Sequence, residues 1–499
     1  MEEYDVIIVG AGVVGALCAR ELSRYRLRVL LVEKAADVCS GASKANSGIV
    51  HATTSPRPGS LKARYCAQGG RLMPAVCREL SVPFERVGSL TVAMSHREMR
   101  VLRGLLARGT TNGDEGLEIV EAERLRCLEP ALSEAAVAAL YAPNVGVVNP
   151  MLLTIAAAEN AVMNGVTLAL NTEVTGLLVE GERIVGVATG CGEYRCRYLV
   201  NATGAHSDEV MRWAGLDDLR LRPRRGDYFV LDRPDRRPGP SEPGHSREGD
   251  PLVRHVIFPI PTPASKGILI TPTTEGNLLL GPTSTVSHWR EHPPVDGDGL
   301  ATVEEQVKRL VHSLDLRRCI AVFAGSRPSG ARDFLVRLEQ RPAGLLNLAG
   351  IESPGLTAAP AIAKEAVRLL AEDGLNLSPN EEFDPVRPAP VRVTELSPEE
   401  RAGLVAEDPA YGRIICRCEE VSEGEIVDAI HSSVPATTLD ALKKRLRVGA
   451  GRCQGGFDLP LVVEILAREL GVSPYEVTKS GSTSAVLAGP TPAAAGSEE

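Results

Sequence analysis

Several features of membrane, secreted and nucleic-acid-binding proteins are missing from this 499-residue chain. No apolar run approaches the roughly 20 residues that span a bilayer, and no basic leader precedes the first strand-like segment. Acidic residues exceed basic ones by 64 to 55, and the net charge of −9 argues against nucleic-acid binding, which needs a basic surface. We therefore expect a cytoplasmic protein that reaches the inner membrane only through a partner. Its length predicts roughly two to four domains.

The chain also lacks the cysteine pattern of a disulfide-stabilised protein. It has 11 cysteines, and most of them are scattered without ligand-like spacing, as small buried hydrophobic side chains would be. The last three differ. Cys416 and Cys418 are separated by one residue, and Cys453 follows in a Gly-rich turn.

A strand, a Gly-rich turn, a helix and a second strand open the chain; they are predicted at residues 5–9, 10–15, 16–23 and 28–32. Gly10 permits the tight turn, Gly12 lets a pyrophosphate approach the backbone, and Gly15 allows close helix–strand packing. Glu33 ends the second strand, where an acidic residue binds the ribose hydroxyls and disfavours the 2′-phosphate of NADP. The N-terminal position of this unit and a later strand that ends in Ala202-Thr203-Gly204 favour FAD over NAD.

Further strands and turns are predicted along the chain. Sheet segments are expected at 87–94 and 222–232, a hairpin at 268–282, and a Gly-rich turn at 350–355 followed by a helix at 359–372.

One enzyme family shares several of these segments, namely residues 33–52, 58–63, 224–228, 324–328 and 350–357. They resemble the D-amino-acid-oxidase-like superfamily of FAD-dependent oxidoreductases. The nearest likeness is to the large-subunit type of bacterial anaerobic glycerol-3-phosphate dehydrogenase. L-2-hydroxyglutarate dehydrogenases share residues 46–51 and 58–63.

The resemblance implies an α/β protein in which an FAD-binding Rossmann-like domain carries an inserted antiparallel-sheet substrate domain. A small, mostly helical C-terminal domain follows. The discontinuous FAD-binding domain is expected at residues 1–85, 148–205 and 325–375, and the substrate or cap domain at 86–147 and 206–324. A linker is expected at 376–411, a ferredoxin-like [2Fe–2S] module at 412–479, and a disordered tail at 480–499.

Dehydrogenation of an alcohol by a flavin needs a base for the hydroxyl proton and a cation for the acidic end of the substrate. His51 is the candidate base, because imidazole titrates nearest to the working pH. Arg327 is the candidate anchor, since a planar guanidinium grips carboxylate or phosphate at two points. Lys266, Tyr228 and Arg225 are candidates for lining the same pocket.

The remaining candidates are cofactor contacts that the resemblance implies. Beside Gly10, Gly12, Gly15 and Glu33, they are Ser43, Lys44, Ser47, Thr203, Gly204, Gly350, Ser353, Gly355, Leu356 and Thr357.

Residues 415–419 and 449–457 resemble the [2Fe–2S] domain of bacterioferritin-associated ferredoxin. Cys416, Cys418 and Cys453 match three of the ligands. The fourth position holds Asp458, and a hard carboxylate is a poorer ligand for iron–sulfide clusters than a thiolate. The sequence therefore leaves open whether a cluster is present, and zinc on the same four residues is an alternative.

The leading hypothesis is an FAD-dependent dehydrogenase that oxidises a small anionic secondary alcohol, sn-glycerol 3-phosphate, to dihydroxyacetone phosphate. Its electrons would pass to a protein partner or a quinone. The enzyme alternative is a 2-hydroxy acid or an amino or imino acid dehydrogenase. The non-enzyme alternative is a flavin-bearing electron-transfer subunit of a larger complex.

Overall fold

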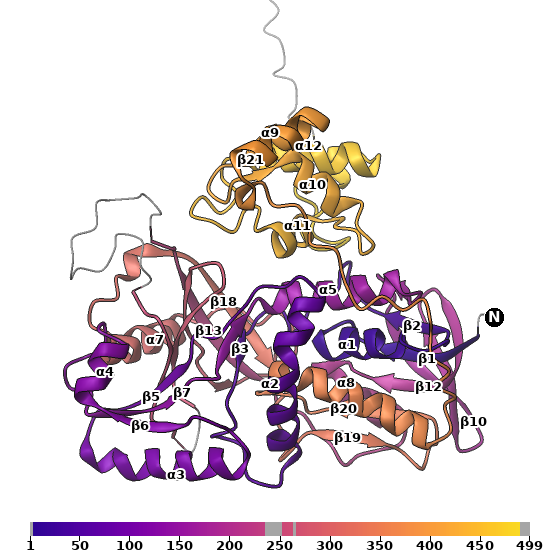
Figure 1. Ribbon diagram of the computed structural model, residues 1–499. Helices are drawn as coiled ribbons and strands as arrows, with labels where there is room; N and C mark the ends of the chain where they lie inside the picture. Colours follow the sequence, from indigo (N-terminus) through magenta and orange to yellow (C-terminus); the bar gives the residue numbers. More distant parts are fainter. Residues whose placement is uncertain (1–2, 235–251, 263–265, 490–499) are drawn as a thin grey trace, which may run out of the picture. The chain divides into compact units, whose positions relative to one another are not determined.

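The computed structural model describes residues 3–234, 252–262 and 266–489 (Figure 1). The chain divides into two compact units, which are described separately. Unit 1 comprises Met1–Lys34 and Val38–Ala389, and unit 2 comprises Ala35–Asp37 and Pro390–Glu499. The last ten residues of the predicted disordered tail, 490–499, lie outside the described residues.

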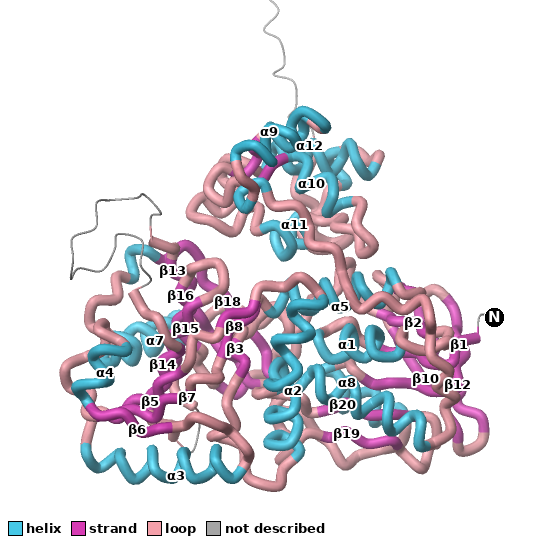
Figure 2. Tube along the Cα trace, viewed as in Figure 1, coloured by secondary structure: helices cyan, strands magenta, loops and turns pink. Residues whose placement is uncertain are grey.

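Within the described ranges, one sheet of unit 1 contains eight strands, of which five run parallel in the order β9-β2-β1-β12-β20 (Figure 2). Val6, Ile7 and Ile8 of β1 are completely buried, as expected of a central parallel strand that is covered on both faces. This sheet confirms the predicted Rossmann-like α/β fold. Its strands are β1 (Glu3–Val9), β2 (Val29–Val32), β9 (Thr167–Ala169), β10 (Val174–Glu180), β11 (Arg183–Thr189), β12 (Gly192–Asn201), β19 (Leu335–Leu338) and β20 (Leu345–Ala349).

Several helices pack around this sheet. They are α1 (Val13–Leu22), α2 (Leu61–Glu79), α5 (Pro150–Met163), α6 (Ser207–Trp213) and α8 (Gly355–Glu372). Helix α1 packs against α5 and α8, and α2 packs against α8. Helix α8 begins four residues earlier than the sequence predicts, at the end of the Gly-rich turn of residues 350–355. None of the helices in the described part of the chain combines the length and the apolar character that a membrane span requires.

The second sheet of unit 1 has nine strands as far as the chain is described, and helices α3 (Met99–Thr111), α4 (Ala122–Leu128) and α7 (Gly297–Leu310) accompany it (Figure 1). The sheet is antiparallel except for the parallel pair β5–β14. The predicted hairpin at 268–282 is present, with Gly276 in its turn at φ +86°. The strands are β5 (Ser89–Ala93), β6 (Glu118–Glu121), β7 (Ala138–Ala142), β13 (Arg224–Leu231), β14 (Val256–Pro259), β15 (Leu269–Pro272), β16 (Leu278–Gly281), β17 (Thr285–Val286) and β18 (Cys319–Arg327).

A short sheet of β3 (Ile49–Val50), β8 (Gly146–Val148) and β4 (Phe84–Glu85) also lies in unit 1. His51 follows β3 directly, so the pairing of β3 with β8 fixes the backbone that enters the candidate base.

Unit 2 is mostly helical. It contains α9 (Pro398–Glu407), β21 (Ile414–Cys416), β22 (Val421–Ser422), α10 (Glu423–Ile430), α11 (Leu439–Leu446) and α12 (Leu459–Leu470). Helix α9 lies inside the segment that the sequence assigns to a linker, and Ser397 and Glu400 form its capping box. Residues 480–486, assigned to a disordered tail, fold back through main-chain hydrogen bonds of Lys479 to Ser484 and of Val486 to Val477.

The start of helix α2 depends on one carboxylate from a distant segment. Asp333 accepts hydrogen bonds from the amides of Leu61 (2.7 Å) and Lys62 (2.9 Å), which no residue of α2 itself can accept. We expect Asp333→Ala to lose about 2 kcal/mol and to lower the Tm by about 2–4 °C. Thermal unfolding monitored by fluorescence tests this. Asp217→Ala, which removes an exposed carboxylate that pairs with Arg220, is the control, and equal Tm values for the two variants would contradict the capping role.

Candidate active site

The Gly-rich turn between β1 and α1 is shaped for a dinucleotide. Gly10 has φ +101°, and a Cβ added there would lie 2.6 Å from the carbonyl oxygen of Ala202. Glu33 Oε2 accepts a hydrogen bond from the amide of Ala11 at 2.9 Å, which places the carboxylate beside the turn. This is where the ribose hydroxyls of a bound dinucleotide would lie.

The N-terminus of α1 and the segment after β12 border the same turn. Gly12 precedes α1 in extended conformation, and Ser43 Oγ accepts a hydrogen bond from the amide of Val13 at 2.9 Å. Gly204 has φ +57°, and Thr203 Oγ1 donates to Asn201 Oδ1 at 2.7 Å. A helix N-terminus next to small, close-packed residues fits a pyrophosphate. The residues present therefore fit the FAD that the sequence predicts.

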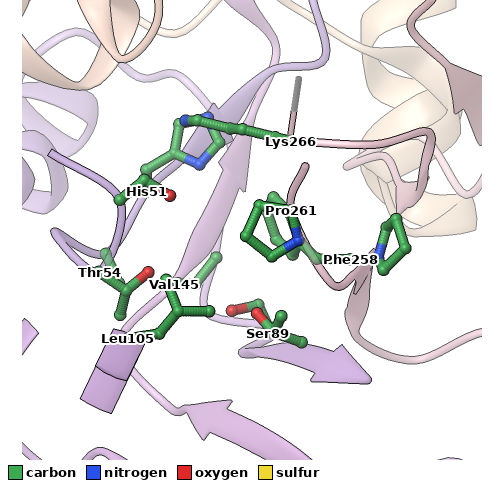
Figure 3. Close-up of a pocket in the computed structure, with 12 residues that line it drawn as sticks. His51, Thr54, Ser89, Leu105, Val145, Phe258, Pro261 and Lys266 are labelled. Carbon is green, nitrogen blue, oxygen red and sulfur yellow. The ribbon is translucent and has the colours of Figure 1, made fainter. Parts of the chain in front are cut away.

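His51 lies at one side of a pocket in unit 1 (Figure 3). Its ring centroid is 6.0 Å from that of Phe258. Burial and the nearby charge of Lys266 hold the pKa of His51 well below its usual range, so the imidazole is neutral at neutral pH and able to accept a proton. The side chain of Lys266 extends toward the His51 ring in Figure 3.

Two cations share this region. Burial lowers the pKa of Lys266 to about 8, and the charge of Arg327 contributes in the same direction. Lys266 Nζ donates to Ser353 Oγ at 3.2 Å, and Arg327 Nη2 donates to the carbonyl of Thr283 at 3.2 Å. No carboxylate within residues 3–234, 252–262 and 266–489 forms an ion pair with either cation. The region is therefore electropositive and suited to an anion.

Successive residues of β13 point to opposite faces of the sheet, which separates Tyr228 from Arg225. Tyr228 lies on the same face as Arg327 of the neighbouring strand, stacks on Phe323 with centroids 4.5 Å apart, and lies 3.3 Å from Ser47 Oγ through its hydroxyl. Arg225 lies on the opposite face and pairs with Asp296 (2.7 Å) and buried Asp227 (3.3 Å). Because successive strand residues point to opposite faces, the expectation that Arg225 lines the pocket is wrong.

The segment that carries Ser43, Lys44 and Ser47 packs against β18. A Cβ added at Gly325 would lie 2.3 Å from the carbonyl oxygen of Ala45, so only glycine fits there. Lys44 is half-buried in this segment.

The start of α8 completes the surroundings of His51. Thr357 Oγ1 accepts a hydrogen bond from the amide of His51 at 3.0 Å and donates to the carbonyl of Ile49 at 3.3 Å. Gly350 has φ +62° in the turn before α8, Gly355 is buried at its first position, and Leu356 is half-buried. The structure thus brings the candidates from 47–51, 228, 266, 327 and 353–357 into one region.

Sequence reasoning missed the neutral walls of the pocket. Beyond His51 and Lys266, it is lined by Ala52, Thr54, Ser55, Ser89, Thr91, Leu105, Val145, Phe258, Pro259 and Pro261. These side chains come from separate strands and loops and carry no motif. Only the strand alternation around Ser89 and Thr91 could have indicated which of them face inward.

The metal-ligand candidates lie in unit 2. Cys416 Sγ is 3.8 Å from Cys418 Sγ, which is 3.6 Å from Cys453 Sγ. Asp458 is 2 % exposed, and neither of its carboxylate oxygens has a hydrogen-bond partner. Thiols at this spacing with an unpartnered carboxylate fit a cluster that supplies the missing bonds.

Comparison with known proteins agrees with this geometry. The family model for FAD-dependent oxidoreductases matches residues 5–369. The chain belongs to this family. It is therefore an FAD-dependent oxidoreductase, as the sequence predicts, and a second model, for BFD-like [2Fe–2S] binding domains, matches residues 414–468.

Individual relatives extend the comparison. A glycerol 3-phosphate dehydrogenase of Caloramator mitchellensis is 42 % identical over 98 % of this chain and 99 % of its own. The dithionite-reduced, FAD-bound L-α-glycerophosphate oxidase of Mycoplasma pneumoniae aligns with a TM-score of 0.71 and 31 % identity, over 79 % of this chain and 100 % of that one. An L-2-hydroxyglutarate dehydrogenase of Escherichia coli is 31 % identical over 58 % of this chain and 65 % of its own.

The close approach at Gly10 gives a test of the cofactor site. We expect the purified protein to carry FAD, and Gly10→Val to lose it, because the new side chain would collide with Ala202 at a backbone angle that valine avoids. The ratio of absorbance at 450 and 280 nm measures this. Gly176→Ala, which meets no atom within 4 Å, should keep its FAD. A Gly10→Val protein with full FAD content would contradict the placement.

Proposed function

We propose that the protein is a dehydrogenase that oxidises sn-glycerol 3-phosphate to dihydroxyacetone phosphate. One observation carries the proposal: Lys266, which forms no ion pair with a carboxylate of the described residues, lines the pocket beside the neutral imidazole of His51, and the charge of Arg327 acts on Lys266. An anionic alcohol supplies both missing elements, a negative charge for the cations and a hydroxyl proton for the base.

Each residue then has a defined task. Arg327 binds the phosphate through two parallel hydrogen bonds. Lys266, in the connection between β14 and β15, adds a second positive charge. His51 accepts the proton of the C2 hydroxyl. The Tyr228 and Ser47 hydroxyls orient the polar end of the substrate, while Phe258 keeps water away from the imidazole. FAD held at the Gly10 turn would supply the hydride acceptor for C2.

Phosphate is favoured over carboxylate by the charge of the pocket. Two cations match the double charge of a phosphate monoester better than the single charge of one carboxylate. A relative that is 42 % identical and aligns over 99 % of its length is named a glycerol 3-phosphate dehydrogenase, whereas the 2-hydroxyglutarate enzyme aligns over 65 % of its length. A 2-hydroxy acid or an amino or imino acid is the second candidate substrate class.

The extent of the relatives bears on the electron acceptor. The alignment with the Mycoplasma oxidase covers all of that protein but only 79 % of this chain. The alignment with the Caloramator dehydrogenase covers 98 % of this chain. Unit 2, which carries Cys416, Cys418 and Cys453 and matches the [2Fe–2S] family model, is of a size to account for this difference. We therefore propose that electrons leave for a protein partner or a quinone-linked subunit rather than for oxygen, and that any membrane association is through that partner.

The anion site is tested by substrate reduction of the flavin. Glycerol 3-phosphate should bleach the flavin anaerobically, and Arg327→Ala should raise KM, because a lost charge-assisted bidentate contact costs roughly 2–4 kcal/mol. The value of kcat/KM should fall as the pH rises through about 8, since the free enzyme's Lys266 then loses its proton. Arg317→Ala, at a 91 % exposed side chain, is the control. Bleaching by L-2-hydroxyglutarate or an amino acid, with none by glycerol 3-phosphate, would contradict the substrate assignment.

The base is tested separately. His51→Ala should slow anaerobic flavin reduction by about 10²–10⁴, with a smaller effect on KM than Arg327→Ala, because the imidazole acts mainly in the transition state. Stopped-flow absorbance at 450 nm gives the rate. His96→Ala, at an exposed histidine just before α3, should behave as the wild type. A His51→Ala rate within tenfold of the wild type would assign proton removal to another group.

A further inference from the structure

Three thiols of unit 2, those of Cys416, Cys418 and Cys453, lie close together. The Sγ atoms of Cys416 and Cys418 are 3.8 Å apart, and those of Cys418 and Cys453 are 3.6 Å apart. The three thiols thus form one group of soft ligands, the kind that iron–sulfide clusters bind.

Backbone amides face the sulfur atoms. The amides of Gly449 and Glu419 are directed at the sulfur of Cys416, and the amide of Cys453 is directed at the sulfur of Cys418. Amide hydrogen bonds to sulfur stabilise thiolate ligands and tune the cluster that they hold. A Cβ added at Gly451 would lie 2.6 Å from Cys418 Sγ, so the chain approaches that sulfur as closely as glycine permits.

The side chain of Asp458 does not cap the helix that it precedes. Asp458 stands at the N-cap of α12, where an aspartate ordinarily accepts a hydrogen bond from the first turn, yet its side chain forms no capping bond. Both carboxylate oxygens are buried without a conventional hydrogen-bond partner, and the side chain next to them is the thiol of Cys416. A buried carboxylate is unfavourable unless it is paired, and a metal–ligand bond would supply that pairing.

A two-iron cluster divides four ligands between two atoms, two for each, and so does not require three side chains to converge on one point.

We infer that Asp458 is the fourth ligand of a [2Fe–2S] cluster whose other ligands are Cys416, Cys418 and Cys453. One iron has two thiolate ligands, and the other has one thiolate and the Asp458 carboxylate. The two irons are therefore inequivalent, and the oxygen-ligated iron leaves more readily because a hard ligand suits an iron–sulfide centre less well. The inference does not depend on the substrate of unit 1.

Anaerobic iron analysis of the full-length protein tests the ligand. The FAD-loaded protein, reconstituted with ferrous iron and sulfide, should contain about two irons and two sulfides per chain and show an EPR signal after dithionite reduction. Cys416→Ser and Asp458→Ala should lose more than half of this iron, whereas Asp458→Cys should retain it. Mössbauer spectra of protein labelled with ⁵⁷Fe should show two iron sites in the wild type and a more uniform pair in Asp458→Cys.

Two controls keep the result interpretable. Asp440→Asn changes an aspartate of the same unit whose side chain pairs with Lys479, and it should keep its cluster. The FAD content of every variant reports on unit 1 and should not change. Asp458→Ala with the iron content and EPR spectrum of the wild type would overturn the assignment, as would a reconstituted wild type that holds no iron.

Discussion

The site in unit 1 depends on one constraint: two positive charges, Lys266 and Arg327, lie close enough to interact, and neither forms an ion pair with a carboxylate of the described residues. Lys266 lies beside His51, and Arg327 is close enough to lower the pKa of Lys266. Both side chains are half-buried, and two like charges brought together there are unfavourable unless an anion compensates them. The pKa of about 8 for Lys266 reflects that cost. An anionic substrate would balance these charges, and burial together with the charge of Lys266 keeps the neighbouring imidazole in its neutral, proton-accepting form.

Segments far apart in the sequence hold this arrangement in place. The Thr357 hydroxyl joins the start of α8 to the backbone at His51, and Gly325 lets β18 lie against the carbonyl of Ala45. Asp333 fixes the start of α2, which packs on α8. The base and the anchor thus come from separate parts of the chain, and their relative positions depend on backbone contacts that small side chains permit.

Much of this was predictable from sequence, and the exceptions have physical reasons. Gly10 and Glu33 mark the dinucleotide turn because their spacing follows from strand and helix geometry. Arg225 was misplaced because a motif does not show which face of β13 a residue occupies, although alternation with Tyr228 does. Helix α9 was missed because its proline-rich surroundings obscured the capping box at Ser397. The lining residue Phe258 has no motif, since tertiary packing alone brings it to His51.

The central claim is that the two cations bind the phosphate while His51 faces the alcohol carbon. An anaerobic crystal structure of the FAD-loaded His51→Ala protein with glycerol 3-phosphate tests it most directly. We predict phosphate oxygens within hydrogen-bonding distance of both the Arg327 guanidinium and the Lys266 ammonium, with the C2 hydroxyl directed at the space left by the imidazole. A phosphate bound away from both cations, or a C2 hydroxyl directed away from position 51, would contradict the proposed site.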